Sequence, residues 1–356
     1  MKVIKIDKSE LDAGLEKLEK SFRLIGPVKE KNYYAFKELK PGQKPDLGFS
    51  NSRLSAKSIV YPQSEVMFEY SLDRNDEKYA ILEEPARSYQ PRAIIGIRPC
   101  DADAYEIVRR NFDTPEYKDS YWLKNYEATT LVGLACKNPG ATCFCTSAHS
   151  GPFSEKNLDV MLVENNDHYL GRLLTEKGEK LAETAGWTTT AAADDTFENL
   201  KQEAESKIKS KVSTDNLASQ SLIALHEAES AIWETEAVSC INCGTCTHAC
   251  PTCWCFDVQD ETYGKSGVRM RNWDSCMYPL FTMHASGHNP RGTKIGRVRQ
   301  RFMHKLKYYV DKYEKGIQCT GCGRCVRLCP VNIDIRRICN KMNSFDPETS
   351  SCEVAS

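Results

Sequence analysis

The chain lacks a long hydrophobic run and an excess of charge of either sign. Its longest aliphatic run, Ala93 to Ile97, is far shorter than the roughly 20 apolar residues that a membrane-spanning helix needs. The N-terminus carries lysines with no apolar stretch behind them. With 48 Lys and Arg against 49 Asp and Glu, the net charge of -1 gives no general reason to bind nucleic acid or an anionic membrane. We therefore predict a cytoplasmic protein with no membrane span and no nucleic-acid partner.

Cysteine is absent from the first 99 residues and unusually common afterwards. Of the 17 cysteines, four lie at Cys100, Cys136, Cys143 and Cys145, twelve lie between Cys240 and Cys339, and the last is Cys352. The reducing cytosol disfavours disulfides, so this many thiols indicate metal or redox chemistry.

Apolar patterning predicts a mixed fold with short elements. The expected elements are a helix from Lys8 to Phe22, strands at Tyr33 to Phe36, Glu65 to Tyr70, Ala93 to Ile97 and Thr129 to Leu134, a helix ending at Phe112, and a hairpin from Leu158 to Leu174. We expect Asp101 or Asp103 to cap the helix that ends at Phe112. Two helices are expected in the Glu- and Lys-rich stretch that follows Asp194.

These elements predict the α+β class, with several units along the 356 residues. The expected parts are an N-terminal α+β segment (1–90), a small α/β domain (91–193), a helical linker (194–238), a two-cluster ferredoxin-like domain (239–345) whose insertion covers 251–318, and a tail (346–356). The composition changes abruptly to Cys, Gly, Arg and aromatic residues at Cys240, which fixes the boundary after the linker.

Two segments share the spacing C-x2-C-x2-C-x3-C-P. They are Cys240, Cys243, Cys246 and Cys250-Pro251, then Cys319, Cys322, Cys325 and Cys329-Pro330. This is the run of bacterial two-cluster ferredoxins, in which the fourth cysteine of each run binds the other cluster. We therefore assign Cys240, Cys243, Cys246 and Cys329 to one 4Fe-4S cluster, and Cys319, Cys322, Cys325 and Cys250 to a second. The alternative is zinc, which four cysteines per run would suffice to bind, but two identical runs ending in Cys-Pro favour a ferredoxin.

Other cysteines extend the possibilities. Cys100, Cys136, Cys143 and Cys145 follow two predicted strands and match one further cluster in number, although free cysteines are often simply buried. Cys253, Cys255 and Cys276 are weaker candidate ligands, with Cys339 as a possible fourth, and a structural role is the alternative for each.

The stretch from Ser286 to Lys315 holds nine Lys and Arg against two acidic residues. It has two interpretations, which are compensation for the negative charge of the clusters and a docking surface for an acidic partner.

Several of these segments together carry a family resemblance. They are Gly96 to Asp101, Pro139 to Thr146, Cys250 to Phe256, Trp273 to Cys276 and Arg299 to Lys305. In these segments the chain resembles the family that contains the anaerobic sulfite reductase A-subunit and the sulfhydrogenase beta subunit. The resemblance implies an iron-sulfur subunit that relays electrons. Its expected partners are a flavin-containing, NAD(P)H-linked subunit on one side and, on the other, a catalytic redox subunit of the sulfite reductase, hydrogenase or heterodisulfide reductase type.

The resulting hypothesis is an electron-transfer component of an anaerobic oxidoreductase complex with no catalytic residues of its own. One alternative makes the chain itself a reductase with a catalytic cluster in 91–193. A less favoured alternative is a nucleic-acid-binding iron-sulfur protein that uses the basic stretch.

Overall fold

A seven-stranded mixed sheet forms the N-terminal half of the computed structural model, which describes residues 2–190 and 194–350. Its order is β1-β8-β7-β6-β5-β2-β3. The strands are β1 (Lys2–Asp7), β2 (Arg23–Lys29), β3 (Tyr34–Glu38), β5 (Arg92–Ile97), β6 (Thr129–Leu134), β7 (Val160–Asn165) and β8 (His168–Leu173). The central strands β2, β5, β6 and β7 run parallel, and β3, β8 and β1 add antiparallel edges.

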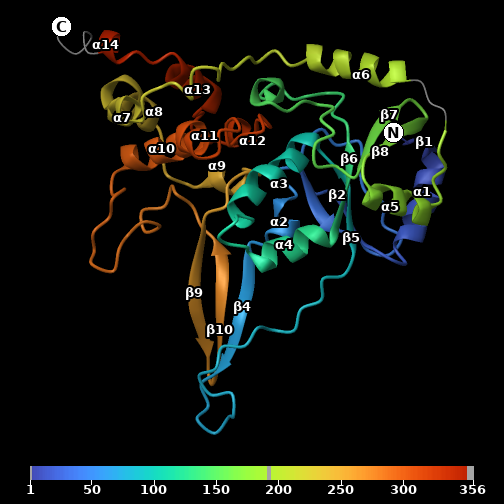
Figure 1. Ribbon diagram of the computed structural model, residues 1–356, viewed down its shortest axis with the longest axis horizontal. Coiled ribbons are helices and arrows are strands. Elements are labelled where there is room, and N and C mark those ends of the chain that lie inside the picture. Colours follow the sequence, from blue (N-terminus) through green and yellow to red (C-terminus); the bar gives the residue numbers. More distant parts are fainter. Residues whose placement is uncertain (1, 191–193, 351–356) are drawn as a thin grey trace.

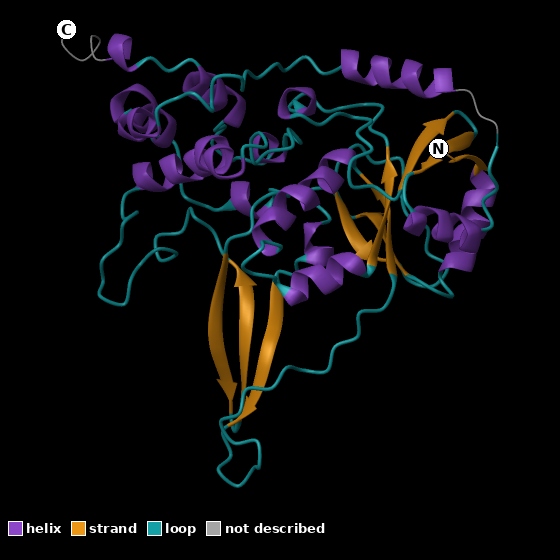
Figure 2. Ribbon diagram, in the orientation of Figure 1, coloured by secondary structure: helices purple, strands orange, loops and turns teal. Residues whose placement is uncertain are grey.

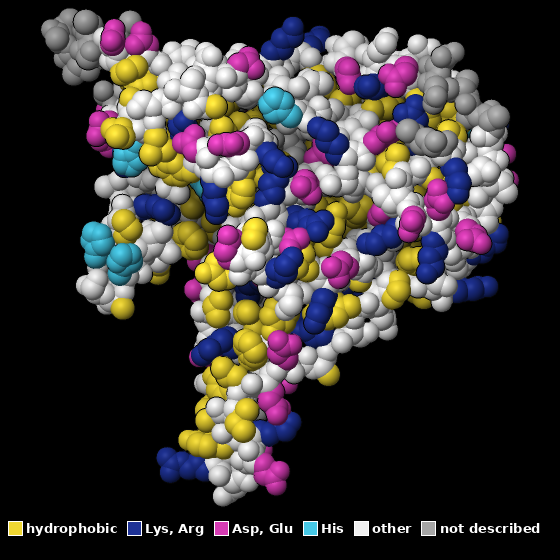
Figure 3. All heavy atoms as spheres, viewed as in Figure 1, with side chains coloured by type: hydrophobic (Ala, Val, Ile, Leu, Met, Phe, Trp, Pro, Cys, Tyr) yellow, Lys and Arg dark blue, Asp and Glu magenta, His cyan; other side chains and the backbone are white. Residues whose placement is uncertain are grey.

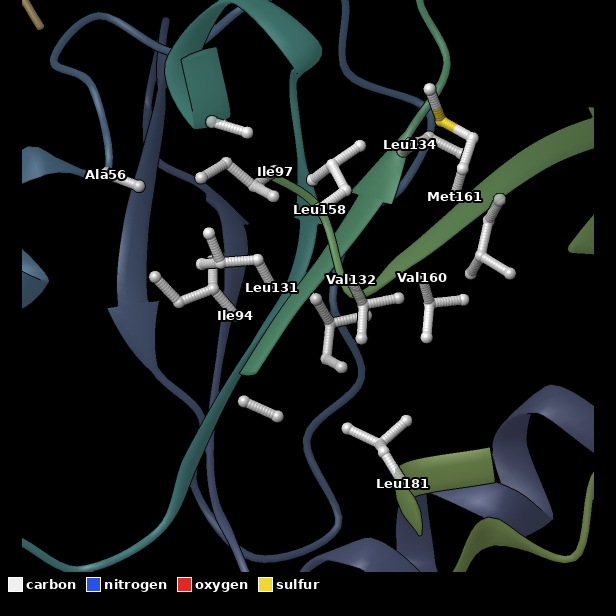
Figure 4. Close-up of a cluster of buried hydrophobic side chains, with 14 of the residues drawn as sticks. Ala56, Ile94, Ile97, Leu131, Val132, Leu134, Leu158, Val160, Met161 and Leu181 are labelled. Atoms are coloured by element: carbon white, nitrogen blue, oxygen red, sulfur yellow. The ribbon is translucent and has the colours of Figure 1, made fainter. Parts of the chain in front are cut away.

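The sheet is buried because its central strands are mostly apolar. Every residue of β6 is buried, as is nearly all of β5, which is typical of parallel strands covered on both faces. The sheet's helices are α1 (Lys8–Leu18), α2 (Lys57–Val60), α3 (Pro99–Phe112), α4 (Ser120–Glu127) and α5 (Glu176–Ala185). In the core that Figure 4 shows, Val132 and Val160 lie on the side of the sheet that faces Leu181 of α5, and Ile94 and Leu131 lie on the opposite side.

The predicted boundary at residue 90 does not separate two folding units. β1 pairs with β8, and β2 pairs with β5, so strands from both sides of this boundary share one ladder. Residues 1–90 and 91–193 therefore build a single α/β unit around the sheet. The predicted strand at Thr129 to Leu134 and the hairpin are present as β6 and β7-β8.

A second sheet forms an arm that projects from the body (Figures 1 and 2). It contains β4 (Ser64–Ser71), β10 (Ser266–Trp273) and β9 (Phe256–Tyr263), in the order β4-β10-β9. The hairpin β9-β10 lies within the expected insertion 251–318, and β4 comes from the N-terminal half. Because β4 pairs with β10, the three-stranded sheet links the insertion to the N-terminal half of the chain.

Short helices surround the second hydrophobic core, in the C-terminal half. They are α7 (Leu222–Glu227), η2 (Glu229–Trp233), α8 (Glu234–Ala237), α9 (Thr245–His248), α10 (Lys294–Met303), η3 (His304–Tyr308), α11 (Tyr309–Tyr313), α12 (Arg324–Arg327), α13 (Ile335–Asn343) and α14 (Pro347–Ser350). The expected linker contains α6 (Asp194–Ser206), which runs along the top of Figure 1. The α+β class is confirmed. Cys352 of the predicted tail lies outside the described residues.

One helix begins earlier than predicted. The N-cap of α3 is Arg98, with Pro99 at the first helical position, so the expected caps Asp101 and Asp103 lie inside the helix. Both aspartates are buried and bind other partners, described below. None of the helices within residues 2–190 and 194–350 has the length and apolarity needed to cross a bilayer.

Candidate iron-sulfur centres

The two cysteine runs adopt the same backbone conformation. Asn242 and Gly321 both have positive φ, and each amide donates to the sulfur two residues earlier, at 3.4 Å in both runs. Gly244 and Gly323 follow with φ of 71° each and precede the short helices α9 and α12. Repeated left-handed positions therefore turn each run around its thiols and direct amide N–H groups to sulfur.

The runs together line two adjoining cavities. Cavity A is lined by the thiol-bearing residues Cys240, Cys243, Cys246, Cys325 and Cys329. Cavity B is lined by Cys250, Cys319, Cys322 and Cys325. Each cavity thus takes three cysteines from one run and Cys329 or Cys250 from the other, and Cys325 borders both. The fold therefore brings together the cysteines of the predicted cross-over arrangement.

Buried cations and unpartnered polar atoms at these cavities fit an anionic group. Arg301 lines cavity A, is 4% exposed, and its Nη1 has no hydrogen-bond partner. Thr320 lines cavity B, and its Oγ1 is also without a partner. Lys305, 2% exposed, lines cavity B and forms no ion pair with a carboxylate of the described residues. A 4Fe-4S cluster with four thiolates carries a net charge of about -2, which would satisfy these cations.

The four upstream cysteines also converge. Cavity C is lined by Cys100, Cys136, Cys143 and Cys145, and in addition by Cys322. Cys100 lies in the first turn of α3, directly after β5, and Cys136 follows β6. Because β5 and β6 are parallel neighbours, their carboxyl ends meet at one edge of the sheet and bring these two thiols together.

Cavity C is closed by the cysteine run of the C-terminal half. The backbone N–H of Phe144 donates to Gly321 O at 2.9 Å, and Thr142 Oγ1 donates to Gly323 O at 3.2 Å. A Cβ atom at Gly321 would lie 2.5 Å from the nitrogen of Cys145. This close backbone approach holds cavities B and C side by side.

A buried ion pair joins the same two regions. Arg324 Nη1 donates to Asp101 Oδ1 at 2.5 Å and Nη2 donates to Oδ2 at 2.6 Å, with the two side chains 0% and 1% exposed. Ser52 accepts two further hydrogen bonds from the same guanidinium, through its carbonyl and its hydroxyl. The pair lies between Cys100 of cavity C and Cys322 of cavity B, so it fixes α3 against α12.

Burial makes four of the thiols in cavities B and C poor thiolates on their own, namely those of Cys100, Cys136, Cys145 and Cys325. It raises the pKa values of Cys100 and Cys136, and that of Cys145 to about 12. Burial likewise raises the pKa of Cys325 to about 12. These side chains are protonated at neutral pH unless a metal displaces the proton, as coordination does.

The weaker candidates form a separate group at the base of the arm. Cys255 immediately precedes β9, and its thiol is hydrogen-bonded to that of Cys276, which follows β10. Cys253 is hydrogen-bonded to Cys250. Cys339 lies on α13, where its thiol donates to Ser213 O at 3.6 Å. The expectation that Cys339 completes a ligand set with the other three is wrong, because it contacts a different part of the chain.

Single metal ions receive no support from the geometry. In residues 2–190 and 194–350 there is no group of three or more His, Cys, Asp or Glu side chains close enough to hold one ion. A four-iron cluster separates its thiolates by the width of the cluster and is a different case. The zinc alternative is therefore not favoured.

Four of the nine cations in the basic stretch are buried. Arg297, Arg301, Lys305 and Lys307 are at most 6% exposed. The face shown in Figure 3 interleaves acidic and basic side chains. Arg301 and Lys305 line cavities A and B, so charge compensation is the interpretation that fits these two residues.

Comparison with known proteins supports the same conclusion. Residues 239–333 match the family model described as a 4Fe-4S dicluster domain. This segment therefore carries the features of a 4Fe-4S dicluster domain. The whole chain is 28% identical to sulfhydrogenase 2 subunit beta of Pyrococcus furiosus over 344 residues, which covers 94% of this chain and 96% of that protein. No solved structure matches.

The resemblance inferred from sequence motifs is thereby confirmed over nearly the whole chain. Together, the domain match and the similarity to a hydrogenase component support an iron-sulfur electron-transfer subunit.

Sequence reasoning missed residues that complete the site. Lys57 and Ser52 come from the N-terminal segment, where no motif marks them, and reach the cysteine regions through tertiary contacts. Lys57 Nζ donates to Cys253 O at 2.8 Å, and burial lowers its pKa to about 8. Nothing in the local sequence distinguishes this lysine from an exposed one.

Proposed function

We propose that this chain is an electron-transfer subunit of a cytosolic oxidoreductase complex and that it holds three 4Fe-4S clusters in a row. The proposed ligands are Cys240, Cys243, Cys246 and Cys329 in cavity A, Cys319, Cys322, Cys325 and Cys250 in cavity B, and Cys100, Cys136, Cys143 and Cys145 in cavity C. When bound, each cluster supplies a one-electron redox centre whose potential depends on hydrogen bonds to sulfur and on exposure.

The observation that carries this proposal is the sharing of cysteines between cavities. Cys325 borders cavities A and B, and Cys322 borders cavities B and C. Three cysteine-lined cavities in contact would place their clusters close enough for electron transfer from one to the next. The buried residues between the cavities keep solvent out.

The two ends of the row approach the surface. At cavity A, Cys243 is exposed and the neighbouring Ile241 is 62% exposed. At cavity C, the lining residue Gly140 is exposed. Separate ends suit separate partners, so we propose that one end meets a flavin-containing, NAD(P)H-linked subunit, while the other end meets a catalytic redox subunit.

Iron and acid-labile sulfide counting, with low-temperature EPR of the reduced chain, tests the number of clusters. We expect about twelve iron atoms in the wild type and about eight in Cys136→Ser, whereas the control Cys339→Ser keeps about twelve, because Cys339 lies outside every cavity. About eight iron atoms in the wild type would disprove the third cluster, and absence of iron would disprove the whole assignment.

A separate assay tests the relay role. The isolated, reconstituted chain with a reduced dye as donor is expected not to turn over sulfite, and activity should require added partner subunits. Sustained turnover by the chain alone would instead support the reductase alternative.

A further inference from the structure

Three cysteines at the base of the arm lie outside the proposed cluster sites. Neither Cys253, Cys255 nor Cys276 lines cavity A, B or C. The two ferredoxin runs already supply eight ligands without them. Their chemistry therefore needs a separate explanation.

The β9-β10 hairpin brings Cys255 and Cys276 together. Phe256 pairs with Trp273 at the end of the ladder, and the backbone N–H of Asp274 then donates to Cys255 O at 2.9 Å. Cys276 comes two residues later. Its thiol is hydrogen-bonded to Cys255, and its backbone N–H donates to the same sulfur. The end of the ladder and the turn that follows it thus bring Cys276 close to Cys255.

The two thiols differ in accessibility. Cys255 is partly exposed and precedes β9, an edge strand whose residues are all exposed. Cys276 is 8% exposed, and the adjacent Ser275 is fully buried with its hydroxyl 2.7 Å from Thr247 Oγ1. One sulfur can therefore meet a solute, while the other is held behind it by a rigid loop.

Two buried lysines lie near Cys255. Lys57 is 4% exposed, donates to Cys253 O, and has its Nζ 3.7 Å from the ring centroid of Trp273. Lys305 donates to Thr252 Oγ1 at 2.9 Å. Neither ammonium forms an ion pair with a carboxylate of the described residues. A partly exposed thiol among cations is the usual environment of a reactive cysteine.

We propose that Cys255 and Cys276 form a thiol-disulfide exchange site for small-molecule disulfides. The Cys255 thiolate attacks the disulfide R–S–S–R, forms a mixed disulfide and expels RS⁻, which takes up a proton. Cys276, whose proton passes to the departing RS⁻, then attacks Cys255 Sγ, forms the Cys255–Cys276 disulfide and expels the second RS⁻, which takes up a proton from solvent. The protein pair loses two electrons and two protons, and the substrate becomes two RSH; a cytosolic dithiol restores the pair by the reverse exchange.

The test treats the cluster-loaded chain with bis(2-hydroxyethyl) disulfide under anaerobic conditions and measures intact mass and cross-linked peptides. We expect the wild type to lose two hydrogens and to give a Cys255–Cys276 cross-linked peptide. Cys276→Ser should instead trap one half of the reagent on Cys255. Cys255→Ser should show no adduct on Cys276, because that thiol is buried. The control Cys339→Ser should react as the wild type does.

Two results would overturn this proposal. The first is no cross-link in the wild type while the denatured chain reacts. The second is loss of iron in Cys255→Ser or Cys276→Ser, which would identify these cysteines as cluster ligands. Iron content is measured for every variant, so a failure of the proposed cluster assignment is seen separately from a failure of the exchange site.

Discussion

The buried pair of Asp101 and Arg324 gives the sharpest test of how the two halves are held together. Asp101→Asn removes the negative charge and preserves the shape of the side chain. The guanidinium of Arg324, which is fully buried, would keep its bonds to Ser52 and one bond to the amide oxygen of Asn, and would lose the second acceptor and the opposite charge. Breaking a buried pair from one side costs about 3–5 kcal/mol, because the remaining charge is left without a partner.

An exposed pair of similar geometry provides the matched control. Arg269 donates twice to Asp260, at 2.7 and 2.8 Å, and the side chains are 39% and 43% exposed. Asp260→Asn should therefore cost only about 0.2–1 kcal/mol. Replacement of both buried partners, in Asp101→Leu with Arg324→Met, should recover much of the stability lost in the single variant.

The assay is anaerobic urea unfolding, followed by circular dichroism and by the visible absorbance of the clusters in one variant series. If Asp101→Asn lowers the free energy of unfolding no more than Asp260→Asn does, the buried pair does not hold the two halves together as we infer. Such a result would mean that water or a rearranged side chain neutralises Arg324 in the absence of its partner.

Three further predictions concern single positions. Burial raises the pKa of Asp103 from 3.8 to about 6, so between these pH values the folded state holds a proton that the unfolded state lacks. The free energy of unfolding should therefore fall by about 3 kcal/mol as the pH rises through this window. Asp103→Asn should remove this fall in unfolding measurements from about pH 4 to 7. Arg301→Met should lower the midpoint potential of the cavity A cluster in an EPR-monitored titration, because a positive charge beside the cluster favours the added electron, and Arg301→Lys should restore part of it. Gly321→Ala should lower the free energy of unfolding by several kcal/mol and displace the loop at cavity C. In the control Gly287→Ala, where φ is 83° and no atom lies within 4 Å of the added Cβ, the loss should be only about 1 kcal/mol. Equal losses in denaturant unfolding would contradict the proposed backbone clash.

The sequence predicts the elements best where local pattern and tertiary setting agree. The apolar runs at β6 and in β7-β8, the latter broken by the turn at Asn166 and Asp167, predict buried strands because their side chains meet the core. The cysteine spacing predicts which thiols gather at cavities A and B, because two-residue gaps allow only a few ways to wrap one cavity.

What the sequence does not predict depends on contacts between distant segments. β1 and β2 are short strands whose assignment comes from pairing with β8 and β5, so the boundary expected at residue 90 disappears once the ladder forms. The strand β9 is exposed along its whole length and carries no apolar period. It becomes a strand through its pairing with β10.

The helix cap at α3 fails for a related reason. Arg98 occupies the cap position because its guanidinium binds the carbonyl groups of Ser50, Leu134 and Ala135 and thereby fixes the chain before Pro99. Aspartate is the better intrinsic N-cap residue, but the carboxylate of Asp101 forms a buried ion pair with Arg324. The buried ion pair with Arg324 therefore decides the position of Asp101, although aspartate is favoured as an N-cap residue.

The buried cations connect folding with cofactor binding. Lys57, Arg301 and Lys305 are each at most 4% exposed, and none forms an ion pair with a carboxylate of the described residues. An uncompensated charge in such a place costs several kcal/mol, so three of them together would exceed the marginal stability of a typical domain. Thiolates that bind iron are the nearby anions at cavities A and B, where Arg301 and Lys305 lie. The free energy of cluster binding must therefore form part of the folding free energy of the C-terminal half, whereas the seven-stranded sheet has its own apolar core and does not depend on it.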